Sequence, residues 1–289
     1  MKLLCAAGLC LFLAEAVFAS SRPSLLVSIP PMACLLEQVA GDDYEVKVLI
    51  PPGSSPHTFE LTPRRMAGLS QCRAFFSLDM PLERRLGDML RSLNPDLPVI
   101  NLNRGVRLRY YQEGEEDRHE GEETGGEQEP DPHTWLNPLN AIIQAEIMAE
   151  SLSALEPSRG EYYRENLNRL SRTLRELDEA LESALAPFAG MSFLAYHPAF
   201  GYLAERYGLT QMAVEQDGKE PGPRRLAATL ERARDIKVKI IFIQPSLPQR
   251  QAQALARELG AQTVSLDPLA KDYILNLKQI AGQLRAGWQ

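Results

Sequence analysis

The stretch SRGEYYRENLNRLSRTLRELDEALESALA, residues 158–186, decides the fold. Its apolar side chains recur at steps of three and four residues, the period of one face of an α-helix. A helix of this length extends on the order of 40 Å, enough to run the height of a domain. A coiled-coil dimer is the alternative, but the stripe is short and lies in mid-chain. A rigid helix between two domains is therefore favoured. The apolar positions are Tyr163, Leu167, Leu170, Leu174, Leu177, Leu181 and Leu185.

On both sides of this helix, short β-branched runs alternate with helical patterns. Such alternation predicts parallel βαβ units, with each sheet covered by helices on both faces. We therefore expect an α/β protein of two doubly wound parallel-sheet domains joined by one long rigid α-helix. The predicted strands are 25–29, 44–50, 74–78, 98–102, 192–196, 209–214, 240–243 and 262–266. The predicted segments are a signal peptide (1–19), a first domain (20–157), the linker helix (158–186) and a second domain (187–289).

The amino terminus has the pattern of an export signal. Lys2 precedes an apolar run, residues 3–13, that is too short to span a bilayer. Small residues then lead to Ala19, after which we expect cleavage. Cys10 lies inside the run without the small residue that usually precedes a lipidated cysteine. We therefore expect a periplasmic protein secreted through a cleaved signal peptide.

Two cysteines, Cys34 and Cys72, remain in the mature chain. An even pair in an exported protein can form a disulfide. Two buried free thiols are an equal alternative, because neither spacing nor count fixes the geometry. A zinc site built from these cysteines is disfavoured, since histidine phrases elsewhere are better candidates.

The charge of the chain also narrows its function. A net charge of −7 and a pI near 5.3 argue against a nucleic-acid surface, which needs a basic face. The segment 112–130 is rich in glutamate and glycine and has almost nothing apolar to bury, so it predicts a disordered acidic loop. It contains His119, which we leave out of the candidate ligands.

Three of the four histidines stand in short proline-flanked phrases, and a fourth phrase carries an aspartate. A single histidine is more often a hydrogen-bonded structural residue than a ligand. Four phrases of one kind, each where a strand-like run gives way to a loop, favour a common site. Three imidazoles and one carboxylate fill a tetrahedral zinc shell. The phrases are PHTFE (56–60), DPHTWLNP (131–138), YHPAFGY (196–202) and LDPL (266–269).

The predicted strands also indicate where the phrases meet. Open α/β sheets bind ligands beyond the carboxyl ends of their strands. Two phrases belong to each predicted domain, so the site is expected in the cleft between the domains.

At these phrases the chain resembles the metal-binding proteins of bacterial ABC importers for zinc and manganese, along nearly the whole mature sequence. The resemblance implies two α/β domains, one long helix, and a divalent ion bound at their interface. Matching phrase to phrase, it implies that His57, His133, His197 and Asp267 are the metal ligands. It also implies capture of Zn²⁺ and its delivery to an ABC membrane permease, without enzymatic turnover. We expect the protein to act as a monomer.

Manganese is the alternative cargo. Manganese-selective relatives usually have a glutamate where His197 stands here, and the additional nitrogen ligand favours zinc over manganese. A zinc hydrolase is a more distant alternative, because it needs an open coordination position and a general base. Glu60 is the nearby candidate base, and it could equally stabilise the start of the next helix. A metal-dependent adhesin is a third alternative that no residue specifically supports.

Overall fold

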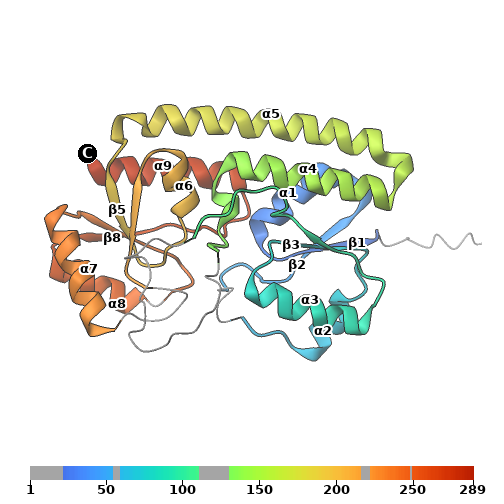
Figure 1. Cartoon of the computed structure of the whole chain (residues 1–289), viewed down its shortest axis with the longest axis horizontal. Helices are drawn as coiled ribbons and strands as arrows, with labels where there is room; N and C mark the ends of the chain where they lie inside the picture. The colour runs from blue at the N-terminus through green and yellow to red at the C-terminus, as the bar shows by residue number, and fades with distance from the viewer. Residues whose placement is uncertain (1–21, 55–58, 111–129, 216–221, 248) are drawn as a thin grey trace, which may run out of the picture.

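The computed structural model describes residues 22–54, 59–110, 130–215, 222–247 and 249–289. The predicted signal peptide, the core of the acidic loop, His57 and His119 lie outside these ranges. Within the ranges, no helix is both long and apolar enough to cross a membrane. Figure 1 shows two α/β halves side by side beneath one long helix, as the alternating pattern predicted.

Each half contains a four-stranded parallel sheet, and the two sheets have the same topology. The first has the order β2-β1-β3-β4 and the second β6-β5-β7-β8. In both, the chain starts in an inner strand, crosses to one edge, then returns past the start to the other edge. The strands are β1 (Ser24–Val27), β2 (Glu45–Val48), β3 (Phe75–Ser77), β4 (Val99–Asn101), β5 (Ser192–Ala195), β6 (Thr210–Ala213), β7 (Ile240–Ile243) and β8 (Gln262–Ser265).

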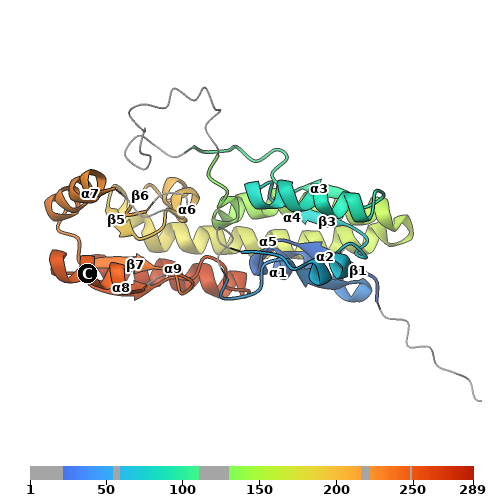
Figure 2. The ribbon, with the colours of Figure 1, turned by 90° about the horizontal axis from the view of Figure 1, so that it is seen from below.

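Helices lie on both faces of the sheets (Figures 1 and 2). In the first half, α1 and α4 lie on the side of the long helix, and α2 and α3 on the opposite side. In the second half, α9 lies under the long helix, and α7 and α8 on the opposite side. The helices are α1 (Pro30–Ala40), α2 (Pro63–Leu69), α3 (Pro81–Leu93), α4 (Pro138–Leu155), α5 (Gly160–Leu185), α6 (Gly201–Arg206), α7 (Pro223–Asp235), α8 (Gln249–Leu259) and α9 (Tyr273–Trp288).

The long helix is α5, with 26 residues, and it joins the halves by packing as well as by connectivity. Its buried stripe includes Tyr163, Leu170, Leu174 and Leu181, as the periodicity predicted. It packs against α1 and α4 of the first half and against α9 of the second. The main hydrophobic core is consequently continuous across both halves, and a smaller core lies on the outer side of the second sheet.

Local signals explain several helix boundaries. Thr62, expected as a helix N-cap, accepts a hydrogen bond from the Arg65 backbone N–H (3.4 Å), and Pro63 occupies the first turn. Helix α4 begins in the same way, because the Asn137 side chain accepts from the backbone N–H of Leu139. Of the two disulfide alternatives, the structure has free thiols at Cys34 and Cys72.

Candidate functional site

The second half places its histidine phrase at the carboxyl end of its sheet. His197 lies two residues beyond β5 and is 2% exposed. Glu215 lies two residues beyond the neighbouring strand β6, which pairs with β5 in parallel register up to Ala195 and Ala213. This register brings the Glu215 carboxylate to the imidazole, with Oε1 2.8 Å from Nδ1 of His197.

The first half presents His133 from a different kind of segment. The residue stands just before a short 3₁₀ turn, Thr134–Leu136, that leads into α4. Asp131, two residues earlier in the same phrase, holds the imidazole with Oδ1 2.7 Å from Nδ1. Asp131 is fully buried, and His133 is 5% exposed.

The two histidines face each other across the junction of the halves. Their Nε2 atoms are 3.3 Å apart, and their ring centroids are 5.2 Å apart. A carboxylate that accepts from Nδ1 selects the tautomer whose Nε2 carries a lone pair. Both lone pairs are then directed at one region, where they attract a cation. Two nitrogens bound to tetrahedral zinc at about 2.05 Å are separated by about 3.3 Å, so the observed spacing suits that ion.

Electrostatics keep the His133–Asp131 pair in this form. Burial alone raises the pKa of the Asp131 carboxyl, but the hydrogen bond with His133 and the positive charge of the nearby Arg109 guanidinium outweigh burial and lower that pKa. Burial lowers the pKa of His133, against the opposing effect of Asp131. The imidazole thus stays neutral at neutral pH, which a metal ligand requires.

The Asp267 phrase lies against the His133 phrase. The indole N–H of Trp135 donates to the Pro268 carbonyl (2.9 Å), and the Tyr273 hydroxyl donates to the Trp135 carbonyl (2.6 Å). Asp267 lies two residues beyond β8, half-buried, and its Oδ1 accepts from the Leu269 backbone N–H (2.9 Å). Within the described ranges, no group of three or more His, Cys, Asp or Glu side chains is close enough to hold a metal.

The sequence-predicted residues therefore divide into three groups. The structure brings His133 and His197 together and places the Asp267 phrase beside them, while His57 lies outside the described residues. Glu60 is exposed. Sequence reasoning gave no role to Asp131, although its phrase was recognised. It missed Glu215 altogether, for which a carboxylate just after a predicted strand was the only available signal.

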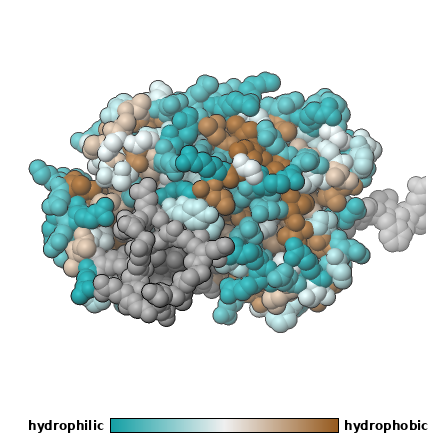
Figure 3. Space-filling view, in the orientation of Figure 1, coloured by the Kyte–Doolittle hydropathy of each residue, from teal (hydrophilic) through white to brown (hydrophobic). Residues whose placement is uncertain are grey.

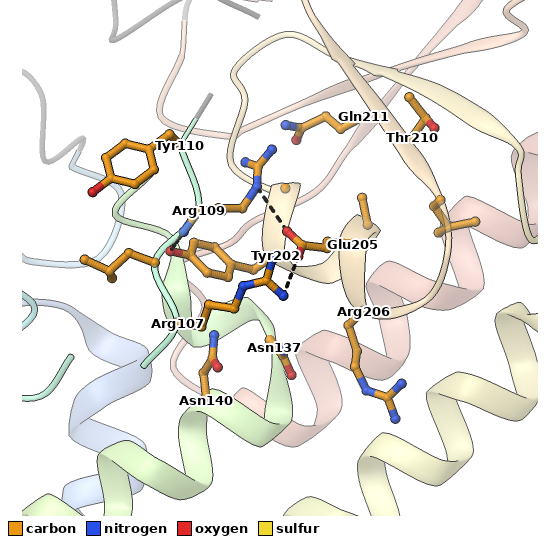
Figure 4. A pocket seen from close by; sticks show the side chains of 14 residues that line it. Arg107, Arg109, Tyr110, Asn137, Asn140, Tyr202, Glu205, Arg206, Thr210 and Gln211 are labelled. Carbon is orange, nitrogen blue, oxygen red and sulfur yellow. Dashed lines mark hydrogen bonds and ion pairs between the residues drawn. The ribbon is translucent and has the colours of Figure 1, made fainter. Parts of the chain in front are cut away.

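Two further residues beside the phrases were not anticipated. Gln244, one residue beyond β7, is 7% exposed, and its Nε2 has no hydrogen-bond partner among the described atoms. Arg109 pairs with Asp131 and lines a surface pocket of about 820 Å³ between α4 and α6 (Figure 4). Other polar residues lining that pocket include Arg107, Asn137, Asn140, Tyr202, Glu205, Arg206, Thr210 and Gln211.

Most of the residues that line this pocket are polar. In the view of Figure 3, hydrophilic residues dominate, and apolar surface gathers near the middle of the face. Exposed Leu108, Tyr110 and Leu139 belong to or adjoin the pocket region. The pocket is thus an open surface feature, whereas the two histidines are buried.

Comparisons with known proteins agree with this geometry. The zinc-binding lipoprotein AdcA of Streptococcus pneumoniae is 31% identical over 254 residues, covering 87% of this chain and 51% of its own length. This chain thus spans about half the length of the curated AdcA proteins that it matches.

Two solved structures share the fold over nearly the whole chain. A crystal structure of ZnuA is 30% identical with a TM-score of 0.84, covering 92% of this chain and 99% of its own. A Zn(II)-bound variant of AdcAII from Streptococcus pneumoniae is 28% identical with a TM-score of 0.80, covering 93% of this chain and 99% of its own. The family model "Zinc-uptake complex component A periplasmic" matches residues 25–287, so the chain belongs to the ZnuA family of zinc-uptake proteins.

Proposed function

We propose that this protein is an extracytoplasmic solute-binding protein that captures Zn²⁺ between its two halves and delivers it to an ABC permease. The observation that carries the proposal is the pair of buried imidazoles, 3.3 Å apart at Nε2, each held by a carboxylate at Nδ1. Its family membership supports a role in solute binding for transport, with capture and release in place of turnover.

The proposed ligands are His57, His133, His197 and Asp267. Two nitrogens of this set are already directed at one region, and the fourth phrase is hydrogen-bonded to the second through Trp135. Three imidazoles and one carboxylate form a closed tetrahedral shell, which suits a bound cargo better than a catalytic centre with an open position. The nitrogen-rich set favours zinc over manganese.

Competition calorimetry on the purified, chelator-treated mature protein tests the proposal. We expect one tight zinc equivalent and much weaker manganese at matched pH and salt. His133→Ala and His197→Ala are each expected to weaken zinc binding by more than about 100-fold, which exceeds the effect of losing an outer-shell partner. His57→Ala is expected to act likewise, and Asp267→Ala less strongly if water takes its place.

His119→Ala is the matched control, because this histidine is outside the proposed shell and should leave the tight equivalent unchanged. Equal or tighter manganese binding would move the protein to the manganese alternative. Absence of a tight equivalent for either ion would overturn the proposed function.

Export and oligomeric state belong to the same proposal. We infer cleavage after Ala19, a periplasmic location and a monomeric receptor. Mass spectrometry of the mature protein recovered from a periplasmic extract should give an amino terminus at Ser20. Light scattering of the same sample should give the mass of one mature chain, and a dimer mass would contradict this inference.

A further inference from the structure

Arg109 occupies a position that links the two halves of the candidate site. It lies eight residues beyond β4, just before the part of the chain that the structure leaves undescribed, and its side chain is only 12% exposed. Its guanidinium forms an ion pair with Asp131, the carboxylate that holds His133 at Nδ1. Its backbone carbonyl also accepts from the Asp131 backbone N–H (2.9 Å). Arg109 and the His133 phrase are thus joined by backbone and side chain.

The other contacts of Arg109 are to α6, the helix that directly follows the His197 phrase. The Tyr202 hydroxyl accepts from the Arg109 backbone N–H (2.9 Å), and the guanidinium lies 5.9 Å from the centre of the Tyr202 ring. Oε2 of Glu205 lies 3.8 Å from Nε of Arg109. Figure 4 shows Glu205 between the guanidinium groups of Arg109 and Arg107. The Arg109 side chain pairs with the carboxylate that holds His133, and it is itself held by residues of the opposite half.

Gly201 makes this approach possible. A Cβ atom at this residue would lie 1.8 Å from Nη1 and 2.3 Å from Cζ of Arg109, and 2.9 Å from Oδ2 of Asp131. Gly201 does not have a positive φ, so the requirement is for space and not for an unusual backbone conformation. The glycine of the His-Pro-Ala-Phe-Gly-Tyr phrase is where α6 meets the Arg109–Asp131 pair.

We propose that Arg109 is a positioning residue for zinc binding, which clamps the Asp131–His133 pair of the first half onto α6 of the second. The inference rests on the proposed function. The clamp fixes the placement of His133 relative to His197, because Asp131 is held between the His133 imidazole and a guanidinium anchored on α6. An imidazole held in place before binding loses less rotational freedom when the ion arrives. Loss of the guanidinium should therefore weaken binding although Arg109 never touches the ion.

The first part of the test measures metal binding. Arg109→Ala is expected to weaken zinc binding by about 10-fold, within the range known for outer-shell partners. Arg109→Lys keeps a cation beside Asp131 and should recover part of the loss. The absorption bands of the Co²⁺-loaded Arg109→Ala variant should shift relative to the parent, since those bands report the placement of the ligands. The Arg109 backbone bond to Tyr202 is available in every variant, so the series isolates the side chain.

Arg107→Ala is the matched control. Arg107 stands two residues away and reaches the same Glu205 at 4.0 Å, but its side chain is 93% exposed, and within the described part of the chain it forms no hydrogen bond or ion pair with Asp131. This variant should match the parent in zinc affinity and in its Co²⁺ spectrum. An equal effect from Arg107→Ala and Arg109→Ala would show a general influence of positive charge and would overturn the positioning role.

The second part of the test needs no metal. In chelator-treated protein, Gly201→Ala should lower the urea midpoint of unfolding, because its methyl group collides with Arg109. In an Arg109→Ala background the same change should lower the midpoint much less, with only the approach to Asp131 remaining. Equal effects in both backgrounds would refute the clamp geometry.

The two parts separate the possible failures. If the parent protein binds no zinc, the proposed function fails, while the metal-free cycle still tests the contact between Arg109 and Gly201. If the parent binds zinc and Arg109→Ala leaves its affinity and Co²⁺ spectrum unchanged, Arg109 is a structural residue only and the inference is wrong.

Discussion

The two halves of the protein support their histidines in different ways. In the first half the supporting carboxylate, Asp131, is two residues from His133 in the same phrase. In the second half the carboxylate, Glu215, comes 18 residues after His197, from the neighbouring strand. Both contacts join a carboxylate oxygen to Nδ1, at 2.7 and 2.8 Å. The same interaction is therefore built once by local sequence and once by sheet register.

The difference follows from where each histidine stands. His197 continues β5 at the carboxyl edge of a parallel sheet, where the next residues of β6 lie alongside it. His133 stands outside the strands, between the Tyr110–Pro130 bridge and the 3₁₀ turn Thr134–Leu136. Its carboxylate comes from its own phrase and is in turn paired with an arginine. Among the described residues, Asp131 therefore has an ion pair with an arginine in addition to its contact with histidine, and Glu215 is paired only with His197.

The largest effect on stability is expected from replacing the two supporting carboxylates, Asp131 and Glu215, one at a time. Asp131→Ala should lower the free energy of unfolding by about 3 kcal/mol, because it removes the buried carboxylate that is paired with the largely buried Arg109 guanidinium. Glu215→Ala should lower it by only about 1–2 kcal/mol, the usual effect of removing one buried hydrogen bond, here the one at Nδ1 of His197. Urea unfolding of chelator-treated protein measures both. A larger loss for Glu215→Ala would reverse the comparison.

A buried carboxylate with no histidine beside it sharpens the comparison. Glu83, 1% exposed, accepts hydrogen bonds from Ser77 Oγ (3.1 Å) and from the backbone N–H groups of Leu78 (3.1 Å) and Met80 (2.7 Å). Burial nevertheless raises its pKa to about 7. The folded state then binds the Glu83 proton more tightly than the unfolded chain does.

This shift fixes the sign of a pH dependence. The stability that the proton contributes is fully present below about pH 4.5 and is lost as pH rises through about 7. Relative to Glu83→Gln, which does not titrate, the parent should lose about 3 kcal/mol over that range. Urea unfolding of both proteins at pH 4.5, 6 and 8 checks this. A constant difference between them would mean that the hydrogen bonds to Glu83 cancel the effect of burial.

The hydrogen bonds that join the His133 phrase to the Asp267 phrase and to α9 should have a smaller effect on stability. Trp135→Phe removes the donor to the Pro268 carbonyl, and Tyr273→Phe removes the donor to the Trp135 carbonyl. Each should lower the free energy of unfolding by about 1 kcal/mol. Because Trp135→Phe separates the Asp267 phrase from the His133 phrase, only this variant should also weaken zinc binding appreciably. Calorimetry alongside unfolding by circular dichroism distinguishes the two.

An exposed ion pair gives the smallest effect and a reference for Arg109–Asp131. Arg104 and Glu150 are paired at 2.5 Å, with side chains 67% and 69% exposed. Their coupling in a double-mutant cycle should be below about 1 kcal/mol and should fall with added salt. The corresponding cycle for Arg109 and Asp131 should give a larger coupling that is less sensitive to salt. Equal values would mean that burial of Asp131 does not strengthen its pair.

Most of the fold was readable from the sequence, because its elements carry strong periodic signals. The leucine stripe of residues 158–186 predicted α5, and the strand predicted at 240–243 matches β7 in full. Helix α4 was not predicted. It is packed between α1 and α5, buried residues occur all around it, and so it lacks the alternation of apolar and polar faces that marks a surface helix. Its proline at the first position and Asn137 cap were the signals available.

The site was only partly readable, for a different reason. A proline-flanked phrase marks a histidine in the sequence, and His133 and His197 do meet in the structure. The side chains that hold them depend on register and on contacts between the halves, which residue patterns do not encode. Glu215 needs the alignment of β5 with β6, and Arg109 needs the packing of α6 against Asp131. The assignment of His57 and Asp267 as ligands stays a prediction.

The path of the chain has a consequence for the order of folding. Each four-stranded sheet is built from one uninterrupted part of the sequence, so its strands can pair before the other sheet exists. Helix α9, the last 16-residue helix, packs against both α5 and α1. A chain that is synthesised from its N-terminus can therefore complete its first sheet early, while the packing of α9 against α1 and α5 forms only after residues 273–288 have appeared.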